Sequence, residues 1–324
     1  MTEALRTATG TATEPDTATE PDTATEPYAA SAADAAREHV AWRAERESDL
    51  RAPHGWLSLT GLLWPTAEPG RLPGLPGEWW VADRALHTRP APGDTTVLRG
   101  ELVAEHGPTS VVVDEGRSLV VGAFVPEPEP AADAPDPEQD DTDPDTEHEV
   151  AVEVVLRTGR YGLRPRDPRA ATLAGFTGVP AFDHDPAWVL DARVTWYDTP
   201  ERVTVGAAQP RLVHHVQVVG EVDVVHGGTV TTLALTGTPA APTLLFSDEA
   251  DDVAPWRVLH VAAPAASSGP SEEEAADSAP GTLRLDLNRA INLPYAFTEF
   301  GTCPAPVAGN HLPFAVTAGE KAPR

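Results

Sequence analysis

The sequence predicts a mainly β protein: an antiparallel β-sandwich or partly open barrel with one N-terminal helix and a long irregular C-terminal loop. Three observations lead to this fold class. About a dozen short runs rich in β-branched and aromatic residues are separated by turn residues. The chain has 34 prolines, which are excluded from helix interiors and central strands. The expected strands do not alternate with helices, which disfavours a doubly wound nucleotide-binding fold.

One helix is expected near the N-terminus, over residues 31–51. Ser31 can cap its first turn, because its hydroxyl can accept a hydrogen bond from a free backbone N–H group. Pro53 follows closely and ends the helix. The apolar positions form a partial stripe along one side: Val40, Trp42 and Leu50.

The expected strands follow in order along the chain. Asp114–Glu115–Gly116 separates two adjacent runs and is expected to form a hairpin connection, as is His226–Gly227–Gly228. The runs are 79–82, 101–104, 109–113, 118–124, 150–156, 189–197, 212–225, 229–235, 243–246, 257–262, 282–287 and 314–316.

Three segments have compositions typical of disordered chain. Residues 1–29 contain an acidic hexapeptide repeat rich in Thr and Pro, and 126–149 and 264–280 are acidic insertions without Lys or Arg. Such segments bury too little apolar surface to offset the entropy of ordering them. We therefore expect a single β domain over 30–322, interrupted by the two insertions. The three segments carry 20 of the 27 net negative charges.

Composition and missing motifs exclude several functions. The acidic balance opposes binding to nucleic acid or to anionic membranes, because phosphate groups require clustered cations. A single cysteine excludes an intrachain disulfide. No phosphate-binding loop, dinucleotide fingerprint, nucleophile elbow or zinc-protease motif occurs, so we expect no cofactor. No secretory signal and no apolar run of 18 residues is present, so we expect a cytoplasmic protein.

An arginine-rich segment, RYGLRPRD at 160–167, is the first candidate site. Arg164 beside Asp167 could hold a carboxylate or phosphate in a bidentate manner. The alternative is a structural salt bridge between Arg164 and Asp167 at a turn. Pro165 makes it doubtful that one strand runs through the segment and places Arg160, Arg164 and Arg166 on one face.

The C-terminal loop supplies the second group of candidates. Asn288 and Arg289 directly follow a predicted strand, and Asn310 lies further along the loop. A long loop with apolar and aromatic residues is expected to pack across the sheet and close one end of it. The asparagines could contact a ligand, or they could satisfy buried backbone groups. Trp56 is expected in the apolar lining of a pocket at that end.

Other polar residues are weaker candidates. Cys303 and His311 could form a nucleophile and base, although a buried, inert cysteine is the simpler interpretation. With Asp286, they make a cofactor-free hydrolase one alternative function. The triplet 183–185, Asp-His-Asp, lies in a turn, where adjacent side chains rarely converge on one ion, so we expect no metal site. Tyr161 precedes the arginine-rich turn and is a further weak candidate.

Three segments resemble the bacterial and archaeal family of unknown function DUF1684. The resemblance implies this family's fold but no activity, because the family has none assigned. The segments are Trp42-Arg43 with GWLSLTGLLW at 55–64; YGLRPRDP at 161–168 with Phe176 and Trp188; and 285–321, which includes LDLNRA, AF at 296–297, TCP at 302–304, Asn310, LP at 312–313 and AGEK at 318–321.

Two departures from the family pattern stand out. The family usually has Asn-Pro-Pro-Cys before Ala-Phe, and this chain has Asn-Leu-Pro-Tyr at 292–295. A cysteine pair with Cys303 is therefore missing. The family also tends to carry Thr-Tyr with Gly-Arg-Phe before the last acidic tract, where this chain has VAPWRVL at 253–259. Both changes could alter a site.

The functional prediction is a β domain that binds a small polar or anionic molecule in a pocket at one end of the sheet structure. The C-terminal loop and the turn from Arg164 to Asp167 would form the mouth of that pocket. The alternatives are the hydrolase and a structural or protein-interaction module.

Overall fold

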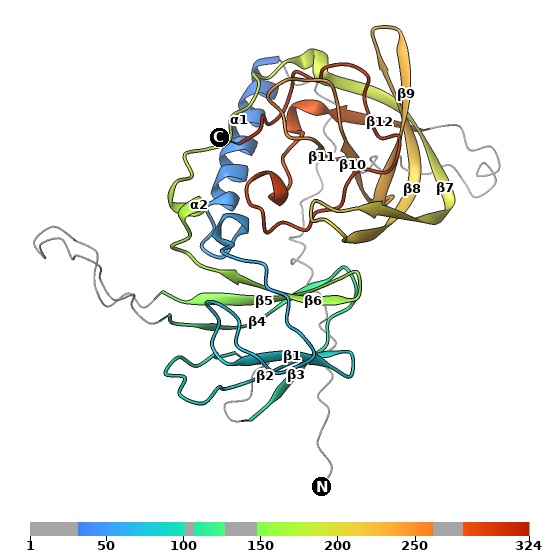
Figure 1. Ribbon diagram of the computed structural model, residues 1–324. Helices are drawn as coiled ribbons and strands as arrows, with labels where there is room; N and C mark the ends of the chain where they lie inside the picture. Colours follow the sequence, from blue (N-terminus) through green and yellow to red (C-terminus); the bar gives the residue numbers. More distant parts are fainter. Residues whose placement is uncertain (1–31, 101–106, 127–147, 262–280, 324) are drawn as a thin grey trace, which may run out of the picture. The chain divides into compact units, whose positions relative to one another are not determined.

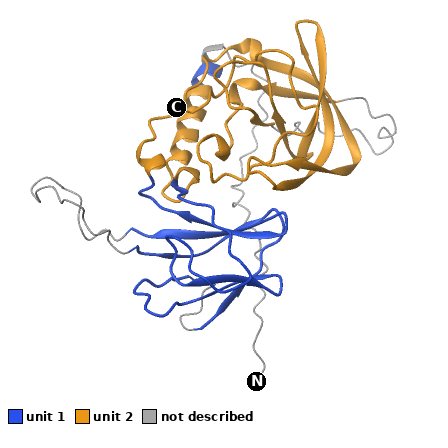
Figure 2. Cartoon of the chain, viewed as in Figure 1, with its two compact units in different colours: residues 1–37, 58–170 blue, residues 38–57, 171–324 orange. Residues whose placement is uncertain are grey.

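The computed structural model describes residues 32–100, 107–126, 148–261 and 281–323. By its internal contacts the chain forms two compact units (Figure 2): unit 1 comprises Met1–Arg37 and Ser58–Ala170, and unit 2 comprises Glu38–Leu57 and Ala171–Arg324. The expectation of one domain with disordered insertions stays a prediction, since those insertions lie outside the described residues. The mainly β, antiparallel fold class is confirmed.

Unit 1 contains two three-stranded antiparallel sheets, with strand orders β1-β2-β3 and β4-β5-β6. Their buried side chains form one hydrophobic cluster to which both sheets contribute, including Trp79 from β1 and Val152 from β5. This is a small sandwich, with its core between the sheets. The strands are β1 Glu78–Ala82, β2 Ala85–Arg89, β3 Thr109–Val111, β4 Ser118–Phe124, β5 Val150–Arg157 and β6 Arg160–Arg166.

Two strands of unit 1 had no counterpart in the sequence prediction. β2 follows β1 through Asp83 and Arg84, which both have positive φ angles, 49° and 62°. Such a turn usually contains glycine or asparagine, so the sequence lacked the usual signal. β6 continues through Pro165, which is tolerated because β6 is the outermost strand of its sheet.

The predicted hairpin at 114–116 was wrong. This turn connects β3 and β4, which belong to different sheets. The carboxylate of Glu115 accepts hydrogen bonds from the backbone N–H groups of Thr158 and Gly159, at 2.7 and 2.8 Å. The turn is therefore tied to the β5–β6 hairpin. The hairpin at His226–Gly228 was correct: His226 and Thr229 pair across it.

Unit 2 is built on a six-stranded antiparallel sheet of order β11-β10-β9-β8-β7-β12. The sheet curls into a half-barrel (Figure 1). A bulge between Trp196 and Glu201 interrupts the pairing of the two longest strands. The strands are β7 Val189–Gly206, β8 Val213–His226, β9 Thr229–Thr238, β10 Ala241–Phe246, β11 Arg257–His260 and β12 Gly281–Asp286.

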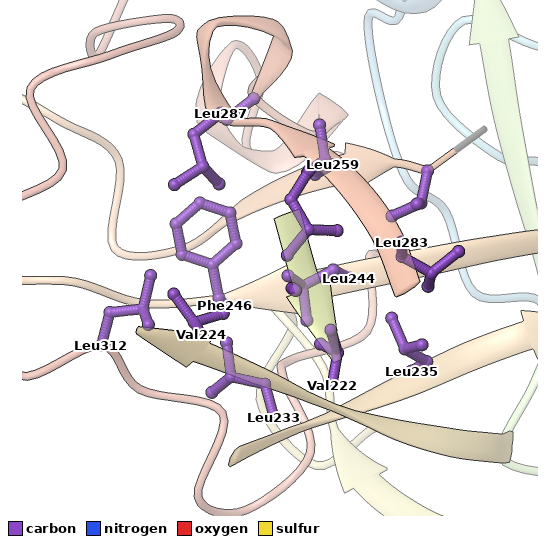
Figure 3. Packing of buried hydrophobic residues seen from close by; sticks show 14 of the residues in the cluster. Val222, Val224, Leu233, Leu235, Leu244, Phe246, Leu259, Leu283, Leu287 and Leu312 are labelled. Atoms are coloured by element: carbon purple, nitrogen blue, oxygen red, sulfur yellow. The ribbon is translucent and has the colours of Figure 1, made fainter. Parts of the chain in front are cut away.

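The core of unit 2 joins the sheet to the C-terminal segment. Leu244 and Phe246 of β10 are fully buried with Leu287 and Leu312, which lie beyond the last strand (Figure 3). This irregular segment packs against the curled sheet, as the sequence predicted. The stretch 314–316, expected as a strand, is irregular.

Helix α1 spans Ala32–Leu50 and ends as expected, but the prediction of Val40 as part of its apolar stripe was wrong. Val40 is 67% exposed, whereas His39 and Leu50 are buried. The helix is held by polar contacts: Arg43 donates to the carbonyl of Val179 at 2.7 Å, and Arg46 to that of Asn292 at 3.0 Å. The predicted Ser31 cap lies outside the described residues.

The remaining helices are short: η1 Trp56–Ser58, α2 Ala171–Ala174, η2 Pro186–Trp188, η3 Leu287–Arg289 and η4 Pro294–Ala296. Within the described parts of the chain, no helix combines the length and apolar character that crossing a membrane requires.

Candidate functional site

Arg164, a predicted ligand-binding residue, lies in a buried ion cluster of unit 1. Its guanidinium binds both carboxylate oxygens of Glu153 on β5, at 3.0 and 2.8 Å. Arg166 binds the same carboxylate at 2.9 and 2.7 Å. Because β6 is regular through Pro165, Arg164 and Arg166 lie on one face of the strand. The structural partner of Arg164 is thus Glu153, where the sequence suggested Asp167.

The charge of Glu153 is stabilised by this cluster. Burial alone would raise the pKa of Glu153, but the adjacent charges of Arg164 and Arg166 outweigh burial and lower it. Asp167 lies at the end of β6 and accepts a hydrogen bond from the backbone of Arg169 at 2.7 Å. Tyr161 donates its hydroxyl to the carbonyl of Arg84 at 3.0 Å. These contacts join parts of unit 1 to one another.

In unit 2, Asn288 is also engaged with the protein itself. Its side chain accepts from the backbone N–H of Asp185 at 2.9 Å and donates to that residue's carbonyl at 3.0 Å. Asp286 caps the short helix η3 by accepting from the backbone of Asn288 at 3.1 Å. Asn288 therefore holds the 183–185 turn against η3, which is the structural alternative that the sequence left open.

Arg289 and Trp56 are more exposed. The Arg289 side chain is 40% exposed, lies 3.3 Å from the carboxylate of Asp286 and has its guanidinium 5.7 Å from the ring centre of Trp42. Trp56 is 37% exposed on η1. Arg289, Asn288 and Trp56 belong to unit 2, whereas Arg164 and Asp167 belong to unit 1.

Asn310 lines a cavity of about 320 Å³ in unit 2. Its amide accepts from the backbone N–H of Ala234 at 2.8 Å and donates to the carbonyls of Ala234 and Leu245, each at 2.9 Å. The Asn310 side chain thus links the backbones of β9 and β10 to the C-terminal loop. The side chains of Thr236 and Thr243, on the same cavity wall, hydrogen-bond to each other at 2.9 Å.

Cys303 and His311 have different surroundings. Cys303 is buried. His311 is half exposed, and its ring nitrogens lie 3.0 Å from the hydroxyl of Ser247 and 3.5 Å from the carboxylate of Glu249. The partners found for His311 are therefore Ser247 and Glu249, and both His311 and Glu249 face solvent.

The Asp-His-Asp triplet is divided between separate contacts. Asp185 caps η2 through the backbone of Ala187 at 2.9 Å. The His184 ring lies 5.1 Å from that of His39. Across the described ranges, no group of three or more His, Cys, Asp or Glu side chains is placed to hold a metal ion.

A larger cavity in unit 2, of about 540 Å³, was not predicted from the sequence. We call it the Glu47 cavity. Glu47 of α1 supplies a carboxylate, and Phe176 and Phe297 supply aromatic surface. The other lining residues are Leu57, Ala171, Thr172, Gly175, Thr177, Gly178, Val179, Pro180 and Pro323.

The carboxylate of Glu47 is positioned by the loop that follows α2. Gly178 has a φ angle of +126°, and a Cβ atom at this position would lie 3.1 Å from the Glu47 carboxylate. Glycine therefore lets the backbone pass beside the carboxylate. The N–H of Val179 donates to Glu47 at 3.4 Å, and Arg43 donates to the same oxygen at 3.3 Å.

The Glu47 cavity brings together the three segments that carry the family resemblance. Leu57 comes from 55–64, Phe176 from the segment that begins at 161, and Phe297 from 285–321. Glu47 itself lies outside these motifs, on a helix whose many Arg and Glu residues are typical of a solvent-exposed face. The only signal available in the sequence was thus the presence of apolar and aromatic residues within the motifs.

Comparison with known proteins finds a family that the core of unit 2 matches. Residues 174–321 match the family described as "Protein of unknown function (DUF1684)". This stretch of the chain is therefore similar to DUF1684. The match covers unit 2 apart from α1 and the residues next to it, so the first resembling segment and the arginine-rich turn lie outside it.

A solved structure is also similar to part of this chain. It is the solution NMR structure of the uncharacterized protein from gene locus rrnAC0354 of Haloarcula marismortui. The sequences are 23% identical, the similarity covers 46% of this chain and 78% of the other, and the TM-score is 0.36. No curated protein matches the chain.

The two departures from the usual DUF1684 pattern contact each other. The rings of Tyr295 and Trp256 stack with centres 4.1 Å apart. The Tyr295 hydroxyl accepts from the backbone N–H of Trp256 at 2.9 Å and donates to its carbonyl at 2.7 Å. Burial raises the pKa of Tyr295, which keeps the hydroxyl protonated and able to donate. The altered residues thus form one packed unit within the fold.

Proposed function

We propose that unit 2 binds a small polar molecule in the Glu47 cavity. Its volume of about 540 Å³ lies within the range of small-molecule sites, about 300–1,000 Å³. The lining combines apolar surface from Leu57, Phe176 and Phe297 with a small number of polar groups, Glu47 and two threonines. The polar surface of the lining exceeds its apolar surface, which suits a polar ligand that also makes some apolar contacts.

The observation that carries this proposal is the convergence of the three resembling segments on one cavity. Packing alone would bring these segments into a common core, but it would not require them to leave a hollow of this volume that is open to solvent. The asparagines and Arg164 that the sequence suggested as ligand contacts are engaged with the chain itself, and this favours the Glu47 cavity over a site built from them.

The test is a binding screen on the full chain with small cationic, neutral and anionic metabolites. Thermal-shift measurements identify binders, and calorimetry determines their dissociation constants. Thr172 lines the cavity and is exposed, so Thr172→Trp should fill part of the volume and weaken binding at least tenfold. Thr282→Trp, at an exposed position of β12, is the matched control and should leave binding unchanged. Equal binding by both variants, or no binder in any class, would refute the proposal.

A further inference from the structure

The charge in the Glu47 cavity differs from what the sequence predicted. Among the described residues that line it, Glu47 alone carries a charge, and that charge is negative. The arginines expected to attract an anion lie elsewhere: Arg164 binds Glu153, and Arg289 lies beside Asp286. Arg43 and Arg51 lie beside this carboxylate but are not among the lining residues, so the charge on the lining itself is negative.

The carboxylate of Glu47 retains capacity for another donor. A carboxylate offers about four lone-pair positions. Three donors approach Glu47: Arg43 at 3.3 Å, the Val179 N–H at 3.4 Å and Arg51 at 3.5 Å. All three are longer than the roughly 2.7–2.9 Å of a strong charge-assisted hydrogen bond. A shorter bond from a ligand would therefore add a contact or replace a weak one.

Arg51 contacts two of the lining residues and shows which kind of group they bind together. Its guanidinium lies 4.9 Å from the ring centre of Phe176, in cation–π geometry, and its Nη1 lies 3.5 Å from Oε2 of Glu47. The Arg51 side chain is also 45% exposed, so it can leave this position at little cost. An aromatic face beside a carboxylate is the combination that recognises ammonium and guanidinium groups.

We propose that the molecule bound in the Glu47 cavity is an organic cation, a primary amine or guanidinium attached to an apolar body. This inference rests on the proposed function. The ligand cation donates to Glu47 and lies against Phe176, where Arg51 now stands in for it, while the apolar body contacts Phe297 and Leu57. Outside the three acidic segments the chain still carries 7 of its 27 net negative charges, which add some long-range attraction for cations and oppose anions.

Three probes of similar shape test the charge preference: benzylamine, benzyl alcohol and benzoate. Calorimetry on the full chain should give an affinity for benzylamine at least tenfold higher than for the other two. Glu47→Gln keeps the shape of the side chain but removes its charge, and should reduce benzylamine affinity at least tenfold. Glu45→Gln, on the exposed face of α1, is the matched control and should leave the affinity unchanged.

The most informative variant is Arg51→Ala, because a preference for cations and a preference for anions predict different results. If Arg51 competes with a ligand cation, its removal should raise benzylamine affinity severalfold. If Arg51 attracts an anion, its removal should abolish benzoate binding and leave benzylamine unaffected. Arg202→Ala on exposed β7 controls for the general loss of one positive charge. The Arg51 side chain is nearly half exposed, so this variant should fold even if Glu47→Gln does not.

The outcomes separate this inference from the proposed function. If molecules of the wider screen bind in the cavity but cations bind no more tightly than neutral or anionic compounds, the cation inference is overturned and the proposed function stands. If no molecule of any class binds, both are overturned. Benzoate binding that exceeds benzylamine binding and is lost in Arg51→Ala would assign an anion site instead.

Discussion

The buried ion pair between Asp248 and Arg257 allows a quantitative test of what holds the C-terminal segment in place. The Arg257 side chain is fully buried, and its Nη2 lies 2.7 Å from Oδ2 of Asp248. The same guanidinium donates to the carbonyls of Ala318, Glu320 and Val316, at 2.5, 3.2 and 3.1 Å. One arginine on β11 therefore fixes three backbone positions of a segment without regular structure.

We expect Asp248→Asn to destabilise unit 2 by about 3–5 kcal/mol. Asparagine has nearly the same shape, so the change removes the negative charge without creating a cavity. Arginine cannot lose its proton in a protein, so Arg257 would stay charged and uncompensated in the core. Removing one partner of a buried pair is costly for this reason.

Native-state hydrogen exchange of the β10 and β11 amides measures this loss, because it reports the local free energy of opening. Protection should fall by about two to four orders of magnitude, since each 1.4 kcal/mol is tenfold. The control is Asp223→Asn, whose partner Arg193 is 65% exposed; an exposed pair contributes about 0–1 kcal/mol. Equal effects of the two variants, or a loss below about 1 kcal/mol for Asp248→Asn, would refute the reasoning.

Three further predictions concern unit 2. Tyr295→Phe leaves the N–H and carbonyl of Trp256 without their hydroxyl partner and should cost about 1–3 kcal/mol in urea unfolding; an unchanged midpoint would contradict this role. Asn310→Ala removes three hydrogen bonds to the backbone and should lower the free energy of unfolding by about 2–3 kcal/mol. Unchanged stability of this variant would indicate that Asn310 serves a ligand and not the fold. Burial, and then the nearby His184, lower the pKa of His39, so folding opposes its protonation. The free energy of unfolding should therefore be constant above the unfolded pKa of about 6.5 and decrease as pH falls below it. His39→Gln should show a smaller decrease between pH 7.5 and 5.0. Parallel stability–pH curves for the wild type and this variant would count against the assignment.

Much of the fold was predictable because the strands have strong local signals. The run that forms β10, for example, contains β-favouring residues bounded by turn residues, and its buried face follows the period of two. β2 and β6 were missed because the turn at Asp83–Arg84 adopts positive φ angles without glycine, and because Pro165 lies inside an edge strand. In both cases tertiary pairing overrides the local preference.

The candidate site was less predictable, for a physical reason. Arg164, Asn288 and Asn310 are polar residues in apolar surroundings, a pattern that ligand-binding groups and buried structural groups share. Only the three-dimensional contacts distinguish them, and here Glu153 or backbone groups occupy these side chains. Glu47 escaped notice because it lies on a helix rich in Arg and Glu, where a charge normally indicates a solvated face.

The most direct test of the central claim, that unit 2 binds a small molecule in the Glu47 cavity, is an amide NMR titration of the full chain with its tightest-binding screen compound. We predict saturable shift changes concentrated at Gly175, Phe176, Gly178 and Val179, and at Phe297, which is distant in sequence but lines the same cavity. Saturable changes that map elsewhere, with these five amides unmoved, would contradict the account.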